Sequence, residues 1–471
     1  MDFLLMKQEI SLIVVFVLLI AYDLLASDSA RKYFHPIACL LLLVHTVLGF
    51  LWQETGTAFS GMYVSGAIEN TVKNILNIGT LIVLLQSNGW LARDIAKHKR
   101  GEFYLLTLST LLGMYLMVSS GNFLLFYIGL EMASLPMAAL IAFDKYIHNS
   151  AEAGAKYIFM AVFSSAIMLF GLSFLYGACG TLYFSDVALV IEPNALIIMA
   201  MIFFLSGLFF KISLVPFHFW TADVYEGAPS NVTAYLSTIS KGAAVFALIS
   251  VLYRVFGHLV IEWQAVLWWL VLISITIGNL FAIRQKNIKR FLAFSSISQA
   301  GYVVLAVMTG TALGMSSMVY YILVYIVSNL AAFGVIIVVK DKTRRLLIKD
   351  YDGFYATNPA LAVIMMIAMF SLAGIPPTAG FFSKFFVFMA AADQKEWLLL
   401  FFALINTVIS LYYYLLVVKA MFINKNETEP IERIETDIYM KIAFAICMAG
   451  IFVLGFTSNV FEYLKNISFG L

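Results

Sequence analysis

Charged residues are scarce in this chain of 471 residues, of which only 12% are Asp, Glu, Lys or Arg and 62% are hydrophobic. A soluble domain usually carries about 25% charged residues, so this chain has too little charge to cover a surface that faces water. The shortage excludes a soluble enzyme, a nucleic-acid-binding protein and a disordered scaffold. It predicts a chain that lies mostly within a lipid bilayer.

Cysteine is scarce too, and its three positions, Cys39, Cys179 and Cys447, lie far apart in the sequence. They form no Cys-x-x-Cys or Cys/His pattern, so we expect no disulfide, no iron–sulfur cluster and no metal site. Long polar segments are also missing, and none of the loops is long enough to fold as a soluble domain. Any redox centre or nucleotide site is therefore expected on another chain.

The apolar residues form long runs, and at about 20 residues per spanning helix the chain has room for about fourteen of them. The first run is long enough to span the membrane and no small-residue cleavage site follows it, so we expect no cleaved signal peptide. The predicted spans are 9–27, 37–53, 75–92, 103–119, 121–143, 155–178, 194–224, 229–256, 265–283, 291–311, 313–339, 359–391, 397–418 and 438–459.

Basic residues gather in the loops that follow the odd-numbered spans, which hold most of the 29 Lys and Arg. The other loops and the two ends of the chain hold few of them: Lys7, Lys73, Arg254, Lys395 and Lys465. Positively charged loops face the cytoplasm, so this asymmetry predicts that both termini lie on the periplasmic side. We assign no role to Lys7 or to Glu9, because both are close to the N-terminus.

A few charges fall inside the spans, where an ionisable side chain is costly and by default marks a pathway or a site. Glu131 lies at the middle of its span and Lys241 lies deep within span 229–256, too far from water for a side chain to reach it. Lys441, at the start of the last span, is better interpreted as a side chain that extends to the interface. For Lys156, in the first turn of span 155–178, the two interpretations are equally good.

A buried lysine next to a carboxylate can move a proton when the two groups separate. Burial favours the neutral amine, whereas a nearby carboxylate favours the ammonium. At an effective dielectric constant near 20, one close pair is worth about 4 kcal/mol. A small displacement of Glu131 from a buried lysine would therefore make that lysine release its proton.

Two predicted spans, 194–224 and 359–391, are too long for a straight crossing of a hydrocarbon core about 30 Å thick. The first contains Pro216 near Lys211, and the second contains the sequence GIPPTAG near Lys384. Proline interrupts a helix, and irregular backbone at membrane depth occurs only where it is buried in protein or lines a wet cavity. Both spans are therefore expected to be discontinuous.

These spans are five apart, an odd number, and so cross the membrane in opposite directions. The fold class we predict is an all-α polytopic membrane protein with two inverted five-helix repeats, spans 4–8 and 9–13. His218 follows the first break, where it could relay protons or hold a loose backbone carbonyl, and the sequence favours neither. The expected domains are an N-terminal three-helix segment, a first repeat, a second inverted repeat and a C-terminal helix, at 1–100, 101–257, 258–424 and 425–471.

The stretch FKISLVPFHFWTADVYEGAPSNVTAYLSTISK, residues 210–241, resembles the core of the proton-translocating antiporter-like subunits of respiratory complex I. Similar motifs follow in the family's order: LEMASLPMAALIAFDK at 130–145, NIKRFLAFSSISQAGY at 287–302 and LAGIPPTAGFFSKFFVF at 372–388. No long lateral helix follows the last span, and Lys384 stands where other members carry glutamate. Within the family the resemblance is therefore to the N type of NADH:quinone oxidoreductase subunit.

The resemblance implies roles for six residues. Glu131 would be the glutamate that pairs with Lys211, Lys241 the central proton-relaying lysine, and Lys384 the lysine at the outward exit. Lys156 and His218 also fall on motif positions and are further candidates for the relay.

The resemblance also implies partners. These are other antiporter-like subunits packed side by side, and the small membrane subunits next to the quinone module, in a bacterial cytoplasmic (inner) membrane. NADH, FMN, iron–sulfur clusters and quinone would belong to partner subunits. We therefore predict a membrane subunit that translocates protons, driven by quinone reduction elsewhere in complex I. A sodium/proton antiporter subunit of the same fold and a non-pumping structural subunit stay open as alternatives.

Overall fold

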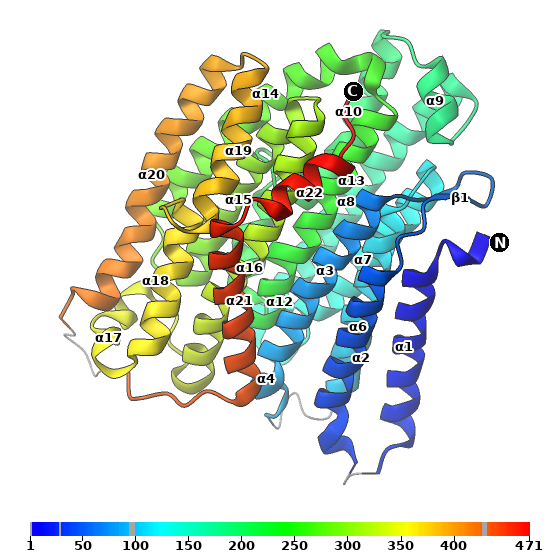
Figure 1. The fold of residues 1–471 in the computed structure, drawn as a ribbon. Helices are drawn as coiled ribbons and strands as arrows, with labels where there is room; N and C mark the ends of the chain where they lie inside the picture. Colours follow the sequence, from blue (N-terminus) through cyan, green and yellow to red (C-terminus); the bar gives the residue numbers. More distant parts are fainter. Residues whose placement is uncertain (1, 28–29, 94–98, 426–430) are drawn as a thin grey trace. The chain divides into compact units, whose positions relative to one another are not determined.

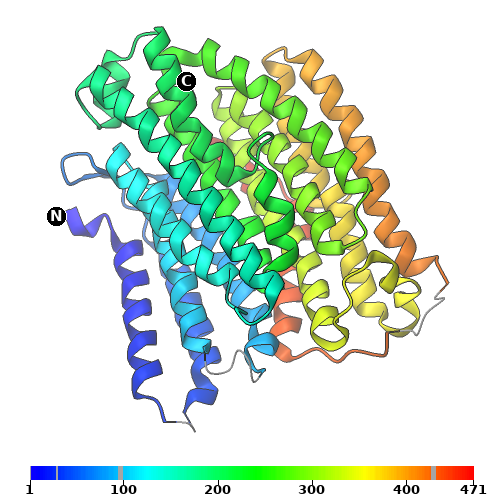
Figure 2. The ribbon, with the colours of Figure 1, turned by 180° about the vertical axis from the view of Figure 1, so that it is seen from behind.

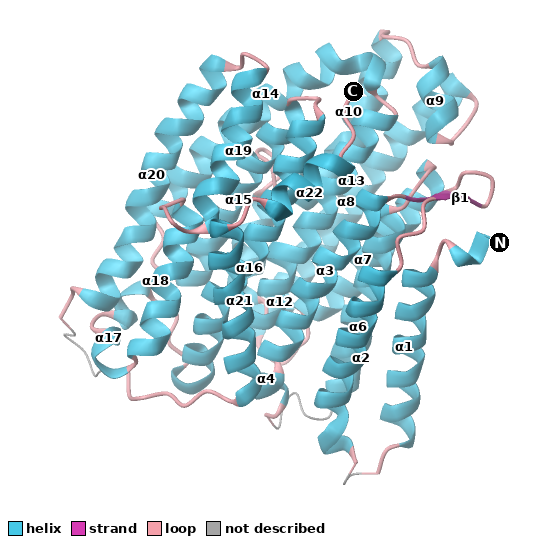
Figure 3. Ribbon diagram, in the orientation of Figure 1, coloured by secondary structure: helices cyan, strands magenta, loops and turns pink. Residues whose placement is uncertain are grey.

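The computed structural model describes residues 2–27, 30–93, 99–425 and 431–471, and helices account for most of them (Figure 3). The one sheet in these residues is an antiparallel hairpin of β1 (Gly56–Ala58) and β2 (Tyr63–Ser65), in which Thr57 pairs with Val64. The chain divides into two compact units. Unit 1 comprises Met1–Lys211, Gly227–Pro229 and Ile239–Glu262, and unit 2 comprises Ile212–Glu226, Ser230–Thr238 and Trp263–Leu471.

Unit 1 contains the helices that carry Glu131, Lys211 and Lys241 (Figure 1). Its helices are η1 (Asp2–Leu4), α1 (Lys7–Leu25), η2 (Arg31–Tyr33), α2 (Phe34–Leu51), α3 (Ala67–Gln86), α4 (Asn88–Leu91), α6 (Arg100–Val118), α7 (Phe123–Ile141), α8 (His148–Cys179), α9 (Phe184–Val190), α10 (Ala195–Ile212), α13 (Lys241–Arg254) and η4 (Gly257–Leu259). Within this unit α1 and α2 run side by side at the N-terminal end of the chain, as Figure 2 also shows from behind.

Unit 2 contains the helices around Lys384. Its helices are α11 (Phe219–Gly227), α12 (Ser230–Tyr235), the π-helical turn η3 (Leu236–Ser240), α14 (Val260–Ile283), α15 (Ile288–Met308), α16 (Ala312–Thr343), η5 (Ile348–Tyr351), α17 (Phe354–Thr357), α18 (Pro359–Ala373), α19 (Ala379–Asp393), α20 (Trp397–Phe422), α21 (Ile438–Phe456) and α22 (Asn459–Ile467).

The chain is a multi-pass membrane protein. In the described residues, 13 helical segments are long and apolar enough to cross a membrane. The predicted span 359–391 is not among them, because it consists of two half-helices of 15 residues each, α18 and α19. Span 194–224 is likewise divided, between α10 and α11. The prediction of an all-α polytopic fold with two discontinuous spans is confirmed.

Two predicted starts are wrong by more than a few residues. Helix α8 begins at His148, seven residues before the predicted start at position 155, so Lys156 lies in the third turn of the helix rather than in its first. The other error concerns the third span. Helix α3 begins at Ala67, eight residues before the predicted start at position 75, so Lys73 lies in the second turn of the helix rather than in a loop. The first half of α3 carries several polar side chains, which lower its local hydropathy below that of the other spans. The short helix α22 was also not predicted, because its nine residues are amphipathic rather than uniformly apolar.

Two glycines bring α6 and α7 into close contact, and α7 carries Glu131. A Cβ on Gly113 of α6 would lie 2.4 Å from the backbone nitrogen of Ala133, and a Cβ on Gly129 would lie 2.5 Å from that of Met117. Small residues at such crossings let two membrane helices approach backbone to backbone. At the start of α7, the side chain of Asn122 caps the helix by accepting from the Leu125 amide at 2.8 Å. These contacts fix the depth and rotation of Glu131 within unit 1.

Candidate functional site

Lys211 is the next-to-last residue of α10, directly before the irregular segment 213–218. The backbone turns sharply there, with Ser213 at a φ of +66°. The Lys211 ammonium donates hydrogen bonds to the Ser134 hydroxyl of α7 and to the Tyr157 hydroxyl of α8, the latter at 3.2 Å. Lys211 is therefore held by two side-chain hydroxyls that belong to two different helices of unit 1.

Glu131 lies on α7 three residues before Ser134, so the two side chains share one face of the helix. Its carboxylate accepts a hydrogen bond from the Ser165 hydroxyl of α8. In the described part of the chain no ion pair joins Glu131 to Lys211, although the Glu131 charge does act on Lys211. The structure thus brings the two expected partners into one cluster, in which separate hydroxyl groups of α7 and α8 bind the ammonium and the carboxylate.

Lys241 opens α13, immediately after the π-helical turn Leu236–Ser240. Single π-helical turns inside helices occur frequently at functional sites. The Lys241 side chain is 5% exposed, which agrees with its predicted depth. At the other end of α13, Arg254 forms an ion pair with Glu69 of α3, and this pair fastens the helix that carries Lys241.

Lys384 lies in the second turn of α19, next to the gap between the two half-helices of unit 2. Its ammonium donates a 2.9 Å hydrogen bond to the backbone carbonyl of Ala373, the last residue of α18. Gly374 follows with a φ of +89°, a conformation that glycine adopts without strain. The helix break therefore releases a carbonyl, and the lysine that the sequence placed near the break binds it.

A small cavity adjoins Lys384. Its volume is about 10 Å³ of space open to the centre of a water molecule, which is room for about one water. Polar side chains of Gln299, Tyr321 and Ser383 line it together with Lys384. The Tyr321 hydroxyl donates to the Gln299 side chain, and the Lys384 ammonium lies 5.0 Å from the centre of the Tyr302 ring.

The other two candidates lie in different surroundings. Lys156 lies on an exposed face of α8, where its ammonium pairs with Glu152 one turn earlier at 2.8 Å. His218 lies in the irregular segment after α10 and stacks on Phe219 with ring centres 4.7 Å apart. Lys156 is therefore engaged with a partly exposed carboxylate of its own helix. Lys441 is exposed on α21, in line with its interpretation as an interfacial lysine.

Sequence reasoning missed the hydroxyl groups that hold the lysines. Ser134 and Tyr157 bind Lys211, and Tyr302 and Tyr321 surround Lys384, yet none of these was a candidate. A buried tyrosine hydroxyl usually finds a hydrogen-bond partner, so the occurrence of Tyr157 and Tyr302 within predicted spans was the available signal.

Comparison with known proteins identifies the family. Residues 120–410 match the profile described as NADH:quinone oxidoreductase/Mrp antiporter, TM. The chain is 55% identical over 462 residues to NADH-quinone oxidoreductase subunit N of Phocaeicola vulgatus, with 98% of each chain covered. It is 54% identical to the subunit N of Azobacteroides pseudotrichonymphae, covering 100% of this chain and 98% of that one. The chain therefore belongs to the family of membrane subunits shared by NADH:quinone oxidoreductases and Mrp antiporters.

Within that family it groups with the N subunits of NADH-quinone oxidoreductase. A chain of respiratory complex I from Thermus thermophilus superposes with a TM-score of 0.81 at 30% identity, covering 97% of this chain and 99% of that one. A chain of the Mrp complex from Dietzia sp. shares the fold alone, with a TM-score of 0.84 at 18% identity and coverage of 98% and 96%.

Proposed function

We propose that this chain translocates protons as a membrane subunit of NADH:quinone oxidoreductase. The observation that carries the proposal is the placement of two lysines beside helix breaks, Lys211 among hydroxyls and Lys384 on a freed carbonyl. Ionisable groups and broken helices inside a membrane protein mark ion pathways. Close identity to subunit N chains supports the same function.

The proton relay that we propose consists of Glu131, Lys211, Lys241 and Lys384. Redox chemistry in other subunits displaces Glu131 relative to Lys211, which changes the free energy of the Lys211 proton. Protons enter from the cytoplasmic side, pass through Lys211 and Lys241, and leave from Lys384. His218 is a further candidate for the entrance, because it lies in the break next to Lys211 in the sequence.

The remaining features of the assembly are part of the same proposal. The chain lies in a bacterial inner membrane with both termini on the periplasmic side, as its basic loops indicate. Other antiporter-like subunits lie beside it, and NADH, FMN, iron–sulfur clusters and quinone are bound by partner subunits. This chain itself supplies the side chains that hold and move the proton.

The test is a Lys241→Met variant of the assembled complex in proteoliposomes. Electron transfer from NADH to quinone and acidification of the vesicle lumen are measured together. We expect the variant to assemble and to translocate fewer protons per electron. Lys441→Met, which removes an exposed lysine, is the matched control and should pump normally. Full pumping by Lys241→Met contradicts the relay.

A sodium/proton antiporter subunit is the second candidate, since the fold is shared with an Mrp complex chain. Purification of the chain with its native partners separates the two functions. Co-purification of subunits that oxidise NADH supports complex I, whereas a purified assembly without them, with sodium-dependent proton exchange in vesicles, supports the antiporter.

A further inference from the structure

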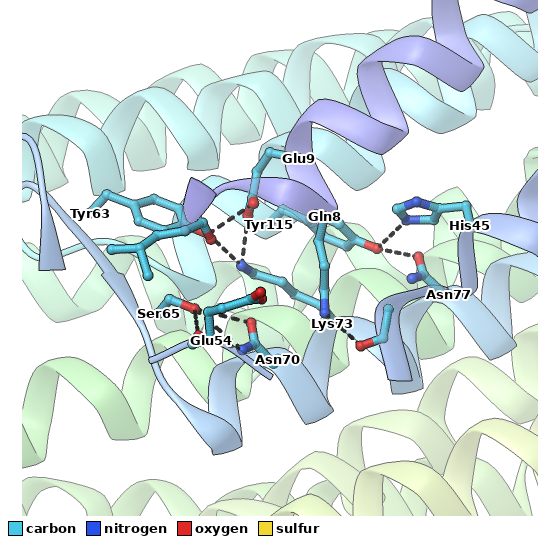
Figure 4. A network of polar contacts seen from close by, with 12 residues as sticks. Gln8, Glu9, His45, Glu54, Tyr63, Ser65, Asn70, Lys73, Asn77 and Tyr115 are labelled. Carbon is cyan, nitrogen blue, oxygen red and sulfur yellow. Dashed lines mark hydrogen bonds and ion pairs between the residues drawn. The ribbon is translucent and has the colours of Figure 1, made fainter. Parts of the chain in front are cut away.

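The N-terminal part of unit 1 contains a buried ion pair outside residues 120–410, the part of the chain that the family profile matches. Lys73 Nζ of α3 and Glu9 Oε1 of α1 are 2.6 Å apart, with side chains 0% and 1% exposed. The Tyr63 hydroxyl of β2 accepts from Lys73 at 2.9 Å and donates to Glu9 at 2.8 Å. Figure 4 shows the three side chains pointing toward one another.

Lys73 belongs to a polar stripe along α3, formed by Asn70, Lys73, Asn74 and Asn77. Their spacing of three and four residues places all of them on one face of the helix, and all four are buried. At one end of the stripe, the Asn70 amide donates at 3.3 Å to the backbone carbonyl of Glu54, whose side chain is exposed. The stripe therefore leads from an exposed loop into unit 1 (Figure 4).

Polar contacts continue beyond the inner end of the stripe. Asn77 accepts a hydrogen bond from the Tyr115 hydroxyl of α6. His45 Nε2 of α2 lies 3.0 Å from the same hydroxyl, and His45 Nδ1 lies 3.0 Å from the hydroxyl of Ser11. Four elements, α1, α2, α3 and α6, thus contribute polar groups to one connected region.

Three side chains of this region carry buried polar atoms that have no protein partner among the described residues: Gln8 Oε1, both amide atoms of Asn74, and Asn77 Nδ2. Gln8 and Asn74 meet at Gly49, where a Cβ would lie 2.2 Å from Asn74 Oδ1 and 3.5 Å from Gln8 Nε2. Buried polar atoms are nearly always hydrogen-bonded, by water where protein offers no partner. Asn74 and Asn77, at the inner end of the stripe, therefore have unmet hydrogen-bonding groups of the kind that bound water satisfies.

A purely structural role, in which the ion pair holds α1 against α3, explains this region poorly. A charge inside a membrane is costly, and a buried ion pair is often no more stabilising than apolar residues of the same volume. Fastening α1 to α3 would also require neither the unpaired amides of Asn74 nor a row of polar groups that reaches the surface.

We propose that Glu9, Tyr63 and Lys73 form a second proton-exchanging site, connected on one side through Asn70 to the loop at Glu54 and on the other to the unpaired amides of Asn74 and Asn77, where water would carry the proton. This inference rests on the proposed function of the chain. Lys73 passes a proton to the Tyr63 oxygen while the Tyr63 hydroxyl proton passes to Glu9, so one N–H bond breaks and one carboxyl O–H bond forms. The Glu9 acid then releases its proton to water, and the neutral Lys73 amine takes one from hydronium. One proton has then crossed the group and the starting charges are restored.

The experiment compares variants of the assembled complex in proteoliposomes. The Glu9→Gln/Lys73→Met double variant removes both charges with little change in volume, so neither charge is left unpaired. Tyr63→Phe removes only the hydroxyl and keeps the ion pair. Tyr104→Phe is the matched control, because it also removes a buried tyrosine hydroxyl from unit 1, one that contacts His35 away from the stripe.

We expect the double variant and Tyr63→Phe to transfer electrons but to lose protons translocated per electron, with Tyr104→Phe unchanged. The redox-induced infrared difference spectrum provides a second readout, in which a carboxylic acid band should disappear in Glu9→Gln/Lys73→Met. If the double variant does not assemble, Tyr63→Phe alone decides the matter. The proposal is overturned if Tyr63→Phe translocates protons normally and if the double variant, where it assembles, has an unchanged infrared spectrum.

Lys241→Met separates this inference from the proposed function. If Lys241→Met loses pumping while Glu9→Gln/Lys73→Met and Tyr63→Phe pump normally, the second site is refuted and the proposed relay is retained. If Lys241→Met pumps normally, the proposed relay is refuted, whatever the result for the variants of Glu9, Tyr63 and Lys73.

Discussion

Lys211 in unit 1 and Lys384 in unit 2 both lie at an interrupted helix, yet they are held differently. Lys211 binds two side-chain hydroxyls, those of Ser134 and Tyr157, and shares its cluster with a carboxylate, Glu131. Lys384 binds a backbone carbonyl that its own helix break has released, beside a cavity for about one water. The first set of contacts can be altered by moving a charge, whereas the second is fixed by the backbone.

This difference assigns different tasks to the two lysines. Hydroxyl groups can rotate and both donate and accept, so the partners of Lys211 can respond when Glu131 moves. The Ala373 carbonyl only accepts, so in the proposed relay Lys384 can keep one geometry in both protonation states. We infer that Lys211 responds to the driving displacement and that Lys384 provides a constant exit, and four predictions test this contrast.

The largest effect is expected from Gly380→Ala. A Cβ there would lie 1.6 Å from the Ser371 carbonyl oxygen, so α19 must move away from α18, at a cost of about 1–3 kcal/mol or more. We expect little assembled complex, measured by its yield and thermal stability. Gly177→Ala on α8, whose new Cβ would have nothing within 4 Å in the described residues, should be tolerated. Equal yields of the two variants would show that the Lys384 site does not depend on this contact.

Variants in which Lys384 itself is replaced should assemble into the complex but fail to translocate protons. Lys384→Met removes the ionisable group, and we expect proton translocation per electron to fall by about tenfold or more. Lys384→Arg keeps a donor for the Ala373 carbonyl, yet arginine does not release its proton, so it should fail as well. Proton translocation by Lys384→Arg at the parental rate would mean that the positive charge suffices and that Lys384 does not exchange a proton.

A smaller effect is expected from Glu131→Gln, which preserves shape but removes the charge that acts on Lys211. We expect slower proton translocation at unchanged assembly, because the displacement no longer changes the free energy of the Lys211 proton. Stopped-flow acidification of proteoliposomes measures the rate. A rate equal to that of the parent would place the driving charge elsewhere.

The smallest effect is expected from Ser134→Ala, which removes one of the two hydroxyls on Lys211. A hydrogen bond to a charged group is worth about 1.5–3 kcal/mol, but Tyr157 remains as a partner. We expect a partial loss of the pumping rate. Ser206→Ala on α10, which loses only a bond to the carbonyl of Phe203 in its own helix, is the control. If the two variants behave alike, Ser134 has no special role.

The membrane spans and their breaks could be predicted from the sequence, because both depend on the order of residue types along the chain. Apolar runs identified the spans, and prolines identified the breaks near Lys211 and Lys384. The start of α3 was misplaced because Asn70, Lys73 and Asn74 lower the hydropathy of its first turns, and burial by neighbouring helices compensates for this only in three dimensions. Their regular spacing was the signal that could have identified α3 as a buried helix.

Site contacts between distant segments could not be predicted in this way. The bond from Lys384 to the Ala373 carbonyl depends on how the chain turns at Gly374, and that geometry is not contained in the residue types. The hydroxyls on Lys211 come from two other helices, whose rotation is set by packing such as the Gly113–Gly129 contact. For the same reason Glu131 and Lys211 share a cluster without the direct ion pair that the resemblance implies.

The hydrogen bond from Lys384 to Ala373 has a consequence for the energetics of proton release. A neutral amine still has two N–H groups, so the bond to the carbonyl can persist after the proton leaves. Neither the side chain nor the broken helix then needs to rearrange between the two protonation states. In the proposed relay, Lys384 can therefore give up its proton without losing this hydrogen bond.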